Sequence, residues 1–189
     1  MSKIAMVTLC IGEPYTQYWR QYSRAGWERY AQRHGYDLVV FSDPLDNSPR
    51  AKTRSPSWQK CCILEKLENY DRVIWIDSDI VIHPAAPAIT EGIQEGKVGA
   101  VISGSYIHPD LRSVFLERAG RNRVGQCDDA EAWRRDQADF YRRAGVQCTS
   151  TDVVNGGVLV LDQSHRGILR RVYEAEYPAD LLNYEQFPL

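Results

Sequence analysis

The sequence predicts an α/β fold in which helices flank a central, mostly parallel sheet. Short apolar runs that are typical of buried strands alternate with longer segments whose apolar residues recur at helical spacing. The length of 189 residues and the hydrophobic content of 43% fit one domain, 1–189, around a single core. In such folds, ligands normally bind at the carboxyl ends of the strands.

The first strand is expected at 3–11, a dense apolar run that ends at Gly12. A helix is predicted at 15–34, and Gly35 supplies its C-terminal stop. Its packing face is expected to contain Tyr18, Tyr22, Trp27, Tyr30 and Ala31. A second apolar strand follows at 37–42.

A polar loop at 43–56 suggests a binding segment beside a strand end. It carries three cationic residues, Arg50, Lys52 and Arg54. Ser57 is expected to cap a helix that runs to about Tyr70. The apolar run 72–76 is the third predicted strand, and it leads directly into Asp77.

The remaining elements continue the alternation of helices and strands. A helix is expected from the prolines at 84 and 87 to about 95, followed by a strand at 98–103. The charged region 106–146 shows only weak helical periodicity. A strand interrupted by a glycine pair is predicted at 153–161, and an amphipathic helix at 164–177.

Composition excludes several classes of function. With 23 basic and 25 acidic residues the net charge is -2, which gives no basic field for nucleic acid. No stretch approaches the roughly 20 apolar residues that a transmembrane helix needs. Five cysteines without Cys-x-x-Cys spacing argue against a disulfide framework or a zinc site and favour a cytoplasmic protein.

Asp77 and Asp79 are the first candidate site. At the end of a buried strand, two carboxylates separated by one residue can point toward one hard cation, Mn²⁺ or Mg²⁺, while Ser78 faces away. Such pairs are also common in turns and caps. However, charge at the edge of a buried sheet is costly unless it is paired or bound to metal.

The second candidate is Asn155-Gly156-Gly157, which lies inside an apolar strand. Glycine weakens a strand and leaves no side chain to pack, so a sugar ring or an acceptor can approach the backbone while Asn155 binds a hydroxyl group. The alternative is a β-bulge without a ligand.

Three stretches then occur in order along the chain: PSWQKCCILEKLENYDRVIWIDSDIVIHP, NGGVLVLD and YEQFPL. Together they resemble the GT-A glycosyltransferases, and within these the glycogenin-like and the fungal and plant galactosyl/xylosyltransferase groups. The stretch YAQRHGYDLVVFSD adds to the likeness with the latter. The resemblance implies a Rossmann-like GT-A domain that moves a hexose or pentose from a nucleotide sugar, with UDP-sugar expected, to a saccharide or other hydroxyl acceptor, with retention.

The resemblance also implies residue roles on the donor side. Asp77 and Asp79 would bind manganese, with Ser78 among the donor-binding residues. Thr8 and Tyr15 would approach the nucleotide base, and Lys60 the donor phosphate or sugar. The alternatives are a strand-forming threonine, a tyrosine that packs at a helix start, and a solvated lysine.

On the sugar side, the resemblance places Asn155, Gly156 and Gly157 along the sugar pocket. Glu185 and Gln186 stand where the family carries an acidic residue and Gln beside the transferred sugar, which makes them the catalytic candidates. The family also supplies a metal-binding His further downstream, but no His follows His165 here. Either the sequence is a piece of a longer protein, or its metal site lacks a ligand.

Two other functions stay open. A haloacid-dehalogenase-like phosphatase would use Asp77 as its nucleophile, Asp128-Asp129 as its acidic motif and Lys97 as its lysine. Such phosphatases usually open with the nucleophile strand, whereas about 70 residues precede it here. The other alternative is a catalytically incomplete module that binds a nucleotide sugar without transferring it.

Overall fold

The computed structural model describes residues 2–102 and 154–177. The chain forms two compact units, Met1–Ala100 with Gly156–Glu185, and Val101–Asn155 with Gln186–Leu189. Nearly all described residues belong to the first unit. The weakly periodic region 106–146 lies outside the described residues, and the single domain over 1–189 stays a prediction.

The described residues form a sheet with the strand order β2-β1-β3-β5-β4. The strands are β1 (Ile4–Leu9), β2 (Asp37–Phe41), β3 (Arg72–Ile76), β4 (Gly99–Ile102) and β5 (Val154–Asp162). Strand β1 pairs in parallel with both β2 and β3, whereas β5 runs antiparallel to β3. The predicted α/β fold and all five predicted strands are confirmed.

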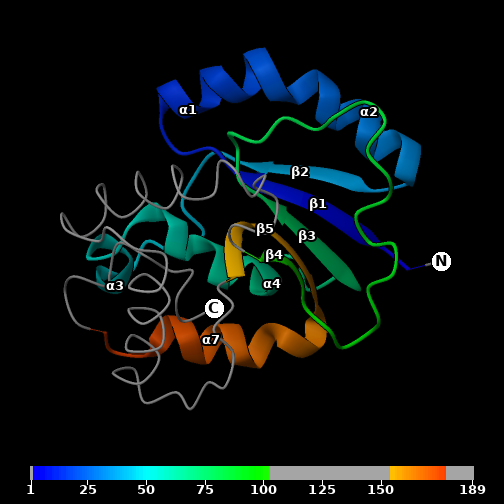
Figure 1. Ribbon diagram of the computed structural model, residues 1–189. Coiled ribbons are helices and arrows are strands. Elements are labelled where there is room, and N and C mark those ends of the chain that lie inside the picture. The colour runs from blue at the N-terminus through cyan, green and yellow to red at the C-terminus, as the bar shows by residue number, and fades with distance from the viewer. Residues whose placement is uncertain (1, 103–153, 178–189) are drawn as a thin grey trace, which may run out of the picture. The chain divides into compact units, whose positions relative to one another are not determined.

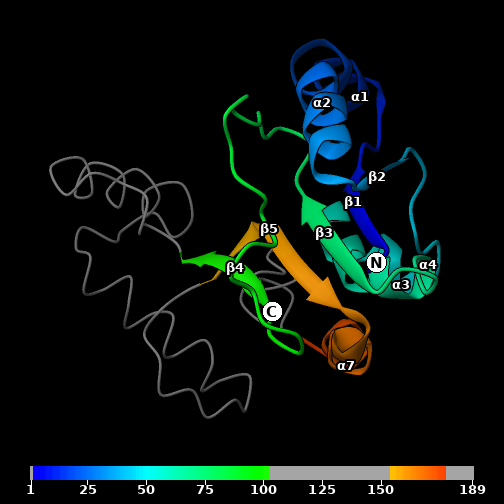
Figure 2. The ribbon, with the colours of Figure 1, turned by 90° about the vertical axis from the view of Figure 1, so that its right-hand side faces the viewer.

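Helices lie on both faces of this sheet. The described helical segments are α1 (Glu13–Tyr18), η1 (Trp19–Ser23), α2 (Arg24–His34), α3 (Pro49–Lys52), η2 (Pro56–Cys62), α4 (Ile63–Lys66), η3 (Gln163–His165) and α7 (Arg166–Glu174). Figures 1 and 2 show α1 and α2 over one face, and α4 and α7 over the other. Each helix in the described ranges is too short or too polar to cross a lipid bilayer.

Segment η1 is a single π-helical turn inside the predicted helix, and it changes the packing face. Tyr18 and Tyr22, expected on that face, are 62% and 59% exposed, whereas Trp19 and Ser23 are buried. A π-turn inserts a residue and rotates what precedes it. The spacing in the sequence indicates this change of face. Trp19, Ser23 and Trp27 follow one another at intervals of four residues, whereas the interval from Tyr22 to Trp27 is five.

Three other helix predictions are corrected by the structure. The segment from 83 to 97 forms a series of turns instead of a helix, with N–H groups donating to the carbonyl three residues earlier. Gly92 and Gly96 interrupt it with φ of 76° and 73°, in the left-handed region that ends a helix. Ser57 caps no helix, because η2 begins at Pro56 and contains it, and the final helix ends at Glu174, before the expected boundary.

The core forms two layers, one on each face of the sheet. On the α2 side, the buried cluster includes Met6, Trp27, Tyr30, Ile74 and Val160. On the other face, η2, α4 and α7 bury Trp58, Cys61, Cys62, Ile63, Leu64, Leu169 and Tyr173. Cys61 and Cys62 are therefore buried packing residues, and burial raises the pKa of the Cys62 thiol to about 12.

Candidate functional site

A pocket of about 280 Å³ opens where β1 and β3 end, and we call it the strand-end pocket. It is lined by Leu9, Ile11, Tyr15, Pro56, Ser57, Trp75, Asp77, Ser78 and Asp79. Parallel strands bring their carboxyl ends to one edge of a sheet, so residues distant in sequence meet there. Four residues predicted from the sequence, Tyr15 and 77–79, lie together in this wall.

Asp77 and Asp79 occupy a turn rather than an extension of β3. The Asp77 N–H donates to the Gly157 carbonyl at 2.8 Å, and the Ile80 N–H closes the turn on the Asp77 carbonyl at 3.1 Å. A turn does not alternate its side chains as a strand does. For this reason Ser78 lines the same pocket as its acidic neighbours, and the expectation that it faces away is wrong.

Lys60 provides the positive charge beside Asp77. Its side chain is only 2% exposed, and Nζ donates to the Gly156 carbonyl at 2.8 Å and to Asp77 Oδ1 at 3.4 Å. The Trp75 indole N–H also donates to Asp77 Oδ1, at 2.7 Å. Charge at the sheet edge is thus paired within the protein, and the alternative of a solvated lysine is wrong.

The oxygen donors of the pocket fit a hard cation. The bonds from Lys60 and Trp75 both use Oδ1 of Asp77. The Asp79 carboxylate is exposed and makes no hydrogen bond or ion pair with the described residues. Within 2–102 and 154–177, no group of three or more His, Cys, Asp or Glu forms a metal centre. The described part of the chain therefore offers two carboxylates, which suits Mg²⁺ or Mn²⁺ only if a ligand supplies further oxygens.

Tyr15 and Thr8, both expected at a nucleotide base, lie in different surroundings. Tyr15 is 63% exposed and lines the strand-end pocket, so it does not pack against the helix start. Thr8 is fully buried. Side chains alternate along β1, so Thr8 faces the side opposite Leu9, which lines the pocket.

The Asn155-Gly156-Gly157 segment lies within β5, which continues without interruption from Val154 to Asp162. The predicted interruption of the strand is therefore wrong, and the alternative of a bulge stays a prediction. Gly156 and Gly157 do not line the strand-end pocket, but their carbonyl groups accept from the Lys60 ammonium and from the N–H of Asp77, which does. Asn155 belongs to the second unit, and Glu185 and Gln186 lie outside the described residues.

Trp75 is the pocket residue that the sequence reasoning missed. Its N–H holds Asp77, and the Lys60 ammonium lies 5.5 Å from the centre of its ring. The available signal was its position in the strand, two residues before the acidic turn.

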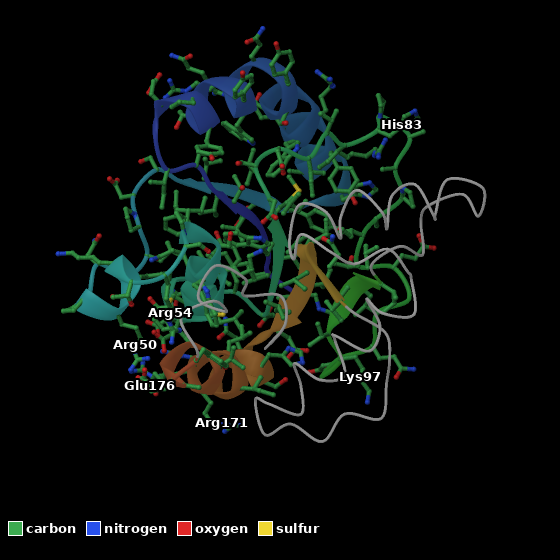
Figure 3. All side chains as sticks on the ribbon, turned by 60° about the vertical axis from the view of Figure 1, so that its left-hand side comes forward. Arg50, Arg54, His83, Lys97, Arg171 and Glu176 are labelled. Carbon is green, nitrogen blue, oxygen red and sulfur yellow. The ribbon has the colours of Figure 1, made fainter. Side chains whose placement is uncertain are left out.

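The cationic loop at 43–56 has a structural role in the described residues. Arg54 is buried, donates to the carbonyl oxygens of Tyr173 and Ala175, and stacks 4.3 Å from the centre of the Trp58 ring. Arg50 pairs with Glu176 at 2.8 Å. Figure 3 shows Arg50, Arg54 and Glu176 gathered beside the end of α7, which these bonds fasten to the loop.

Lys97 lies near the start of β3, at the opposite end of that strand from Asp77. The preceding N–H, of Gly96, donates to Asp162 at 2.7 Å, and Asp162 is the register partner of Arg72, the first residue of β3. Asp77 follows the last residue of that strand, about 17 Å away. Figure 3 shows Lys97 close to β4. Asp128 and Asp129 lie outside the described residues.

Comparisons with known proteins give a remote likeness among solved structures. No protein-family model and no curated protein matches the chain. Among solved structures, a similar chain is described as a glycosyltransferase involved in the glycosylation of the major capsid of PBCV-1. The two share 18% identity with a TM-score of 0.44, over 97% of this chain and 72% of that chain. These values are too low to bear on function, which has to be argued from the chain's own residues.

Proposed function

We propose that this protein is a metal-dependent glycosyltransferase that uses a nucleotide sugar, with UDP-sugar as the expected donor. The observation that carries the proposal is the strand-end pocket, which gathers Asp77, Ser78, Asp79 and Tyr15 at the carboxyl ends of β1 and β3. This is where α/β sheets bind nucleotides. The three sequence stretches that resemble GT-A glycosyltransferases include this acidic turn.

Asp77 and Asp79 would hold Mn²⁺ or Mg²⁺ together with the donor diphosphate. When bound, the cation stabilises the charge that develops on the leaving diphosphate. The exposed ring of Tyr15 would stack on the nucleotide base, and the Ser78 hydroxyl would bind a donor oxygen. The proposed transfer of a hexose or pentose with retention would involve Glu185 and Gln186.

Lys60 has a two-part role in this proposal. Without a ligand it neutralises Asp77 from a buried position. Once a cation binds Asp77, the two positive charges repel each other, and the ammonium gains by contacting the anionic diphosphate instead. Its bond to the Gly156 carbonyl at 2.8 Å keeps the amine at the pocket through this exchange.

The position of Lys97 disfavours the phosphatase. A lysine that neutralises phosphate on Asp77 must reach the end of β3, whereas Lys97 lies near the start of that strand. We expect no aspartyl-phosphate on Asp77 when the protein is treated with a phosphomonoester such as p-nitrophenyl phosphate. Mass spectrometry after rapid quenching would detect the adduct if the phosphatase were correct.

The test is UDP binding, measured by calorimetry with and without Mn²⁺. We expect Asp77→Asn and Asp79→Asn each to weaken Mn²⁺-dependent UDP binding by about 10-fold or more. Asp43→Asn is the matched control, because Asp43 is exposed and lies outside the pocket wall. Unchanged binding in both pocket variants would refute the assignment.

Turnover separates a transferase from a binding module. UDP-glucose, UDP-galactose and UDP-xylose are each incubated with Mn²⁺ and a mixture of saccharide acceptors, and released UDP is measured. Release that disappears in Asp79→Asn supports the transferase. Mn²⁺-dependent UDP binding without release from any of these donors would favour the binding module.

A further inference from the structure

A second pocket, of about 440 Å³, lies between the first helical segment and β2, and we call it the helix–strand pocket. Its floor includes Leu38 and Val40, which pair in register with Met6 and Thr8. Paired residues share a face of the sheet, so this pocket lies on the side opposite Leu9 and the strand-end pocket. The two pockets share no lining residue, and the proposed transfer uses none of the residues that line this one.

The helical wall of the pocket includes the π-turn η1. Trp19 and Arg20, the first two residues of that turn, both line the pocket. Single π-turns are rare and are frequently found at functional sites. This turn brings the Trp19 indole against the sheet and carries Arg20 to the pocket, which the uninterrupted helix predicted from the sequence does not do.

Two buried polar atoms accompany this pocket. Trp19 Nε1 and Thr8 Oγ1 are the buried side-chain nitrogen or oxygen atoms that find no hydrogen-bond partner in the described part of the chain. Trp19 lines the pocket, and Thr8 is the register partner of Val40 in its floor. An unpartnered buried polar group costs about 1–3 kcal/mol, so the Trp19 indole in the pocket wall carries a cost that a ligand acceptor can offset.

The helix–strand pocket has a net positive charge. Arg24 is paired with Glu28 at 2.7 Å, so these two neutralise each other. Arg20 makes no ion pair or hydrogen bond with any described residue. Burial raises the pKa of the Cys10 thiol, and the Arg20 guanidinium is close enough to oppose that rise. One uncompensated positive charge therefore faces a pocket with an apolar floor.

We propose that the helix–strand pocket binds a small organic anion. Its charged head pairs with the Arg20 guanidinium, which binds phosphate or carboxylate through parallel N–H bonds, and its apolar body lies on Leu38 and Val40. The Trp19 indole N–H in the pocket wall has no partner among the described residues and can donate to the ligand. The volume lies within the usual range for small-molecule sites.

The probe is phenyl phosphate, titrated in the absence of divalent metal and followed by ¹⁵N-resolved NMR of the five indole N–H groups. We expect the Trp19 signal to shift. The Trp27 N–H is bonded to the Ile80 carbonyl at 3.0 Å and should stay in place. The Trp75 N–H is bonded to Asp77 and reports the strand-end pocket instead, so the two proposals can fail independently.

Arg20→Gln should weaken phenyl phosphate binding by about 10-fold, because it removes one charge-assisted pair. Arg29→Gln is the matched control, since Arg29 is exposed on α2 and does not line the pocket. Inorganic phosphate should bind more weakly than phenyl phosphate, because it has no apolar body to contact Leu38 and Val40. A static Trp19 signal up to roughly 10 mM probe, or equal binding by Arg20→Gln and wild type, would overturn the proposal.

Discussion

The contact between Lys60 and Asp77 makes a quantitative prediction about stability. Lys60 is almost fully buried and donates to the Gly156 carbonyl, whereas the Asp77 side chain is 39% exposed. In Lys60→Met the side-chain volume is nearly kept, but a buried carbonyl loses its partner, which costs about 1–3 kcal/mol. Because solvent screens the ion pair with Asp77, its loss costs less than about 1 kcal/mol of stability. Part of this loss is offset, because the variant no longer has to bury a charged ammonium.

We therefore expect Lys60→Met to lower the free energy of unfolding by about 2 kcal/mol, equivalent to about 4–8 °C in Tm. Asp77→Asn keeps a carbonyl oxygen for the Trp75 N–H but leaves the buried ammonium without its carboxylate, so it should also destabilise. The double variant removes the buried ammonium together with the carboxylate. The two changes should then cost about 1 kcal/mol less together than the sum of the single changes.

The assay is urea unfolding of the wild type, both single variants and the double variant, followed by far-UV circular dichroism. Lys66→Met is the matched control, because Lys66 is exposed on α4, and its effect should stay within about 0.5 kcal/mol. Additivity within about 0.5 kcal/mol would show that Lys60 and Asp77 are not energetically coupled, which refutes the reasoning.

Three further predictions concern the framework. Gly35→Ala should lower the free energy of unfolding, measured in urea, by about 1 kcal/mol because φ is 70° at this position. Gly167→Ala should raise it by about 0.5 kcal/mol, since Gly167 lies in α7 with open space around its Cβ position. Equal effects of the two changes would contradict the backbone argument. Arg54→Leu should lower the free energy of unfolding by about 2 kcal/mol, because the Tyr173 carbonyl loses its Arg54 donor and the Ala175 carbonyl keeps only the longer bond from Arg50. Exposed Arg171→Leu should be near neutral by the same measurement. Burial alone would raise the pKa of Asp162, but hydrogen bonds from Ser164 and the Gly96 N–H outweigh burial and lower this pKa. The ionised carboxylate therefore stabilises the fold above about pH 4, and this contribution is lost as acid protonates the group. Asp162→Asn should accordingly flatten the fall of the urea midpoint between pH 5 and about 3.

The strands were predictable because each is a short apolar run closed by a polar residue or glycine. The first helix was predictable in extent but not in packing, since a π-turn is chosen by which side chains fill the core, and Trp19 fills more of it than Tyr18. The turns at 83–97 were missed because apolar residues recur there at helical spacing. The left-handed conformations of Gly92 and Gly96 override that periodicity.

At the candidate site, the sequence located the acidic turn but not its surroundings. Asp77 and Asp79 were found because charge directly after a buried strand is unusual. Tyr15 joins them because β1 and β3 are parallel neighbours and end at the same edge of the sheet. The burial of Lys60 follows from the path of η2 beneath the sheet, which no local pattern in the sequence encodes.

The contact between Lys60 and Asp77 also predicts how Mn²⁺ and UDP affect each other's binding to the strand-end pocket. Because Lys60 already pairs with Asp77, Mn²⁺ alone has to compete with an internal positive charge for this carboxylate. A diphosphate relieves that competition, since it offers the ammonium another anion and supplies oxygens to the metal. Under the proposed function, Mn²⁺ and UDP should therefore bind cooperatively, each tightening the other by the same factor.

Free Mn²⁺ measured by electron paramagnetic resonance, with and without UDP, gives that factor. In Lys60→Met the competing charge is absent, so Mn²⁺ alone should bind more tightly and the cooperativity with UDP should fall. Lys66→Met should leave both quantities at the wild-type values, because Lys66 lies outside the wall of this pocket. If Lys60→Met bound Mn²⁺ alone no better than the wild type, the ion pair with Asp77 would not be what limits metal binding, and the two-part role of Lys60 would have to be abandoned.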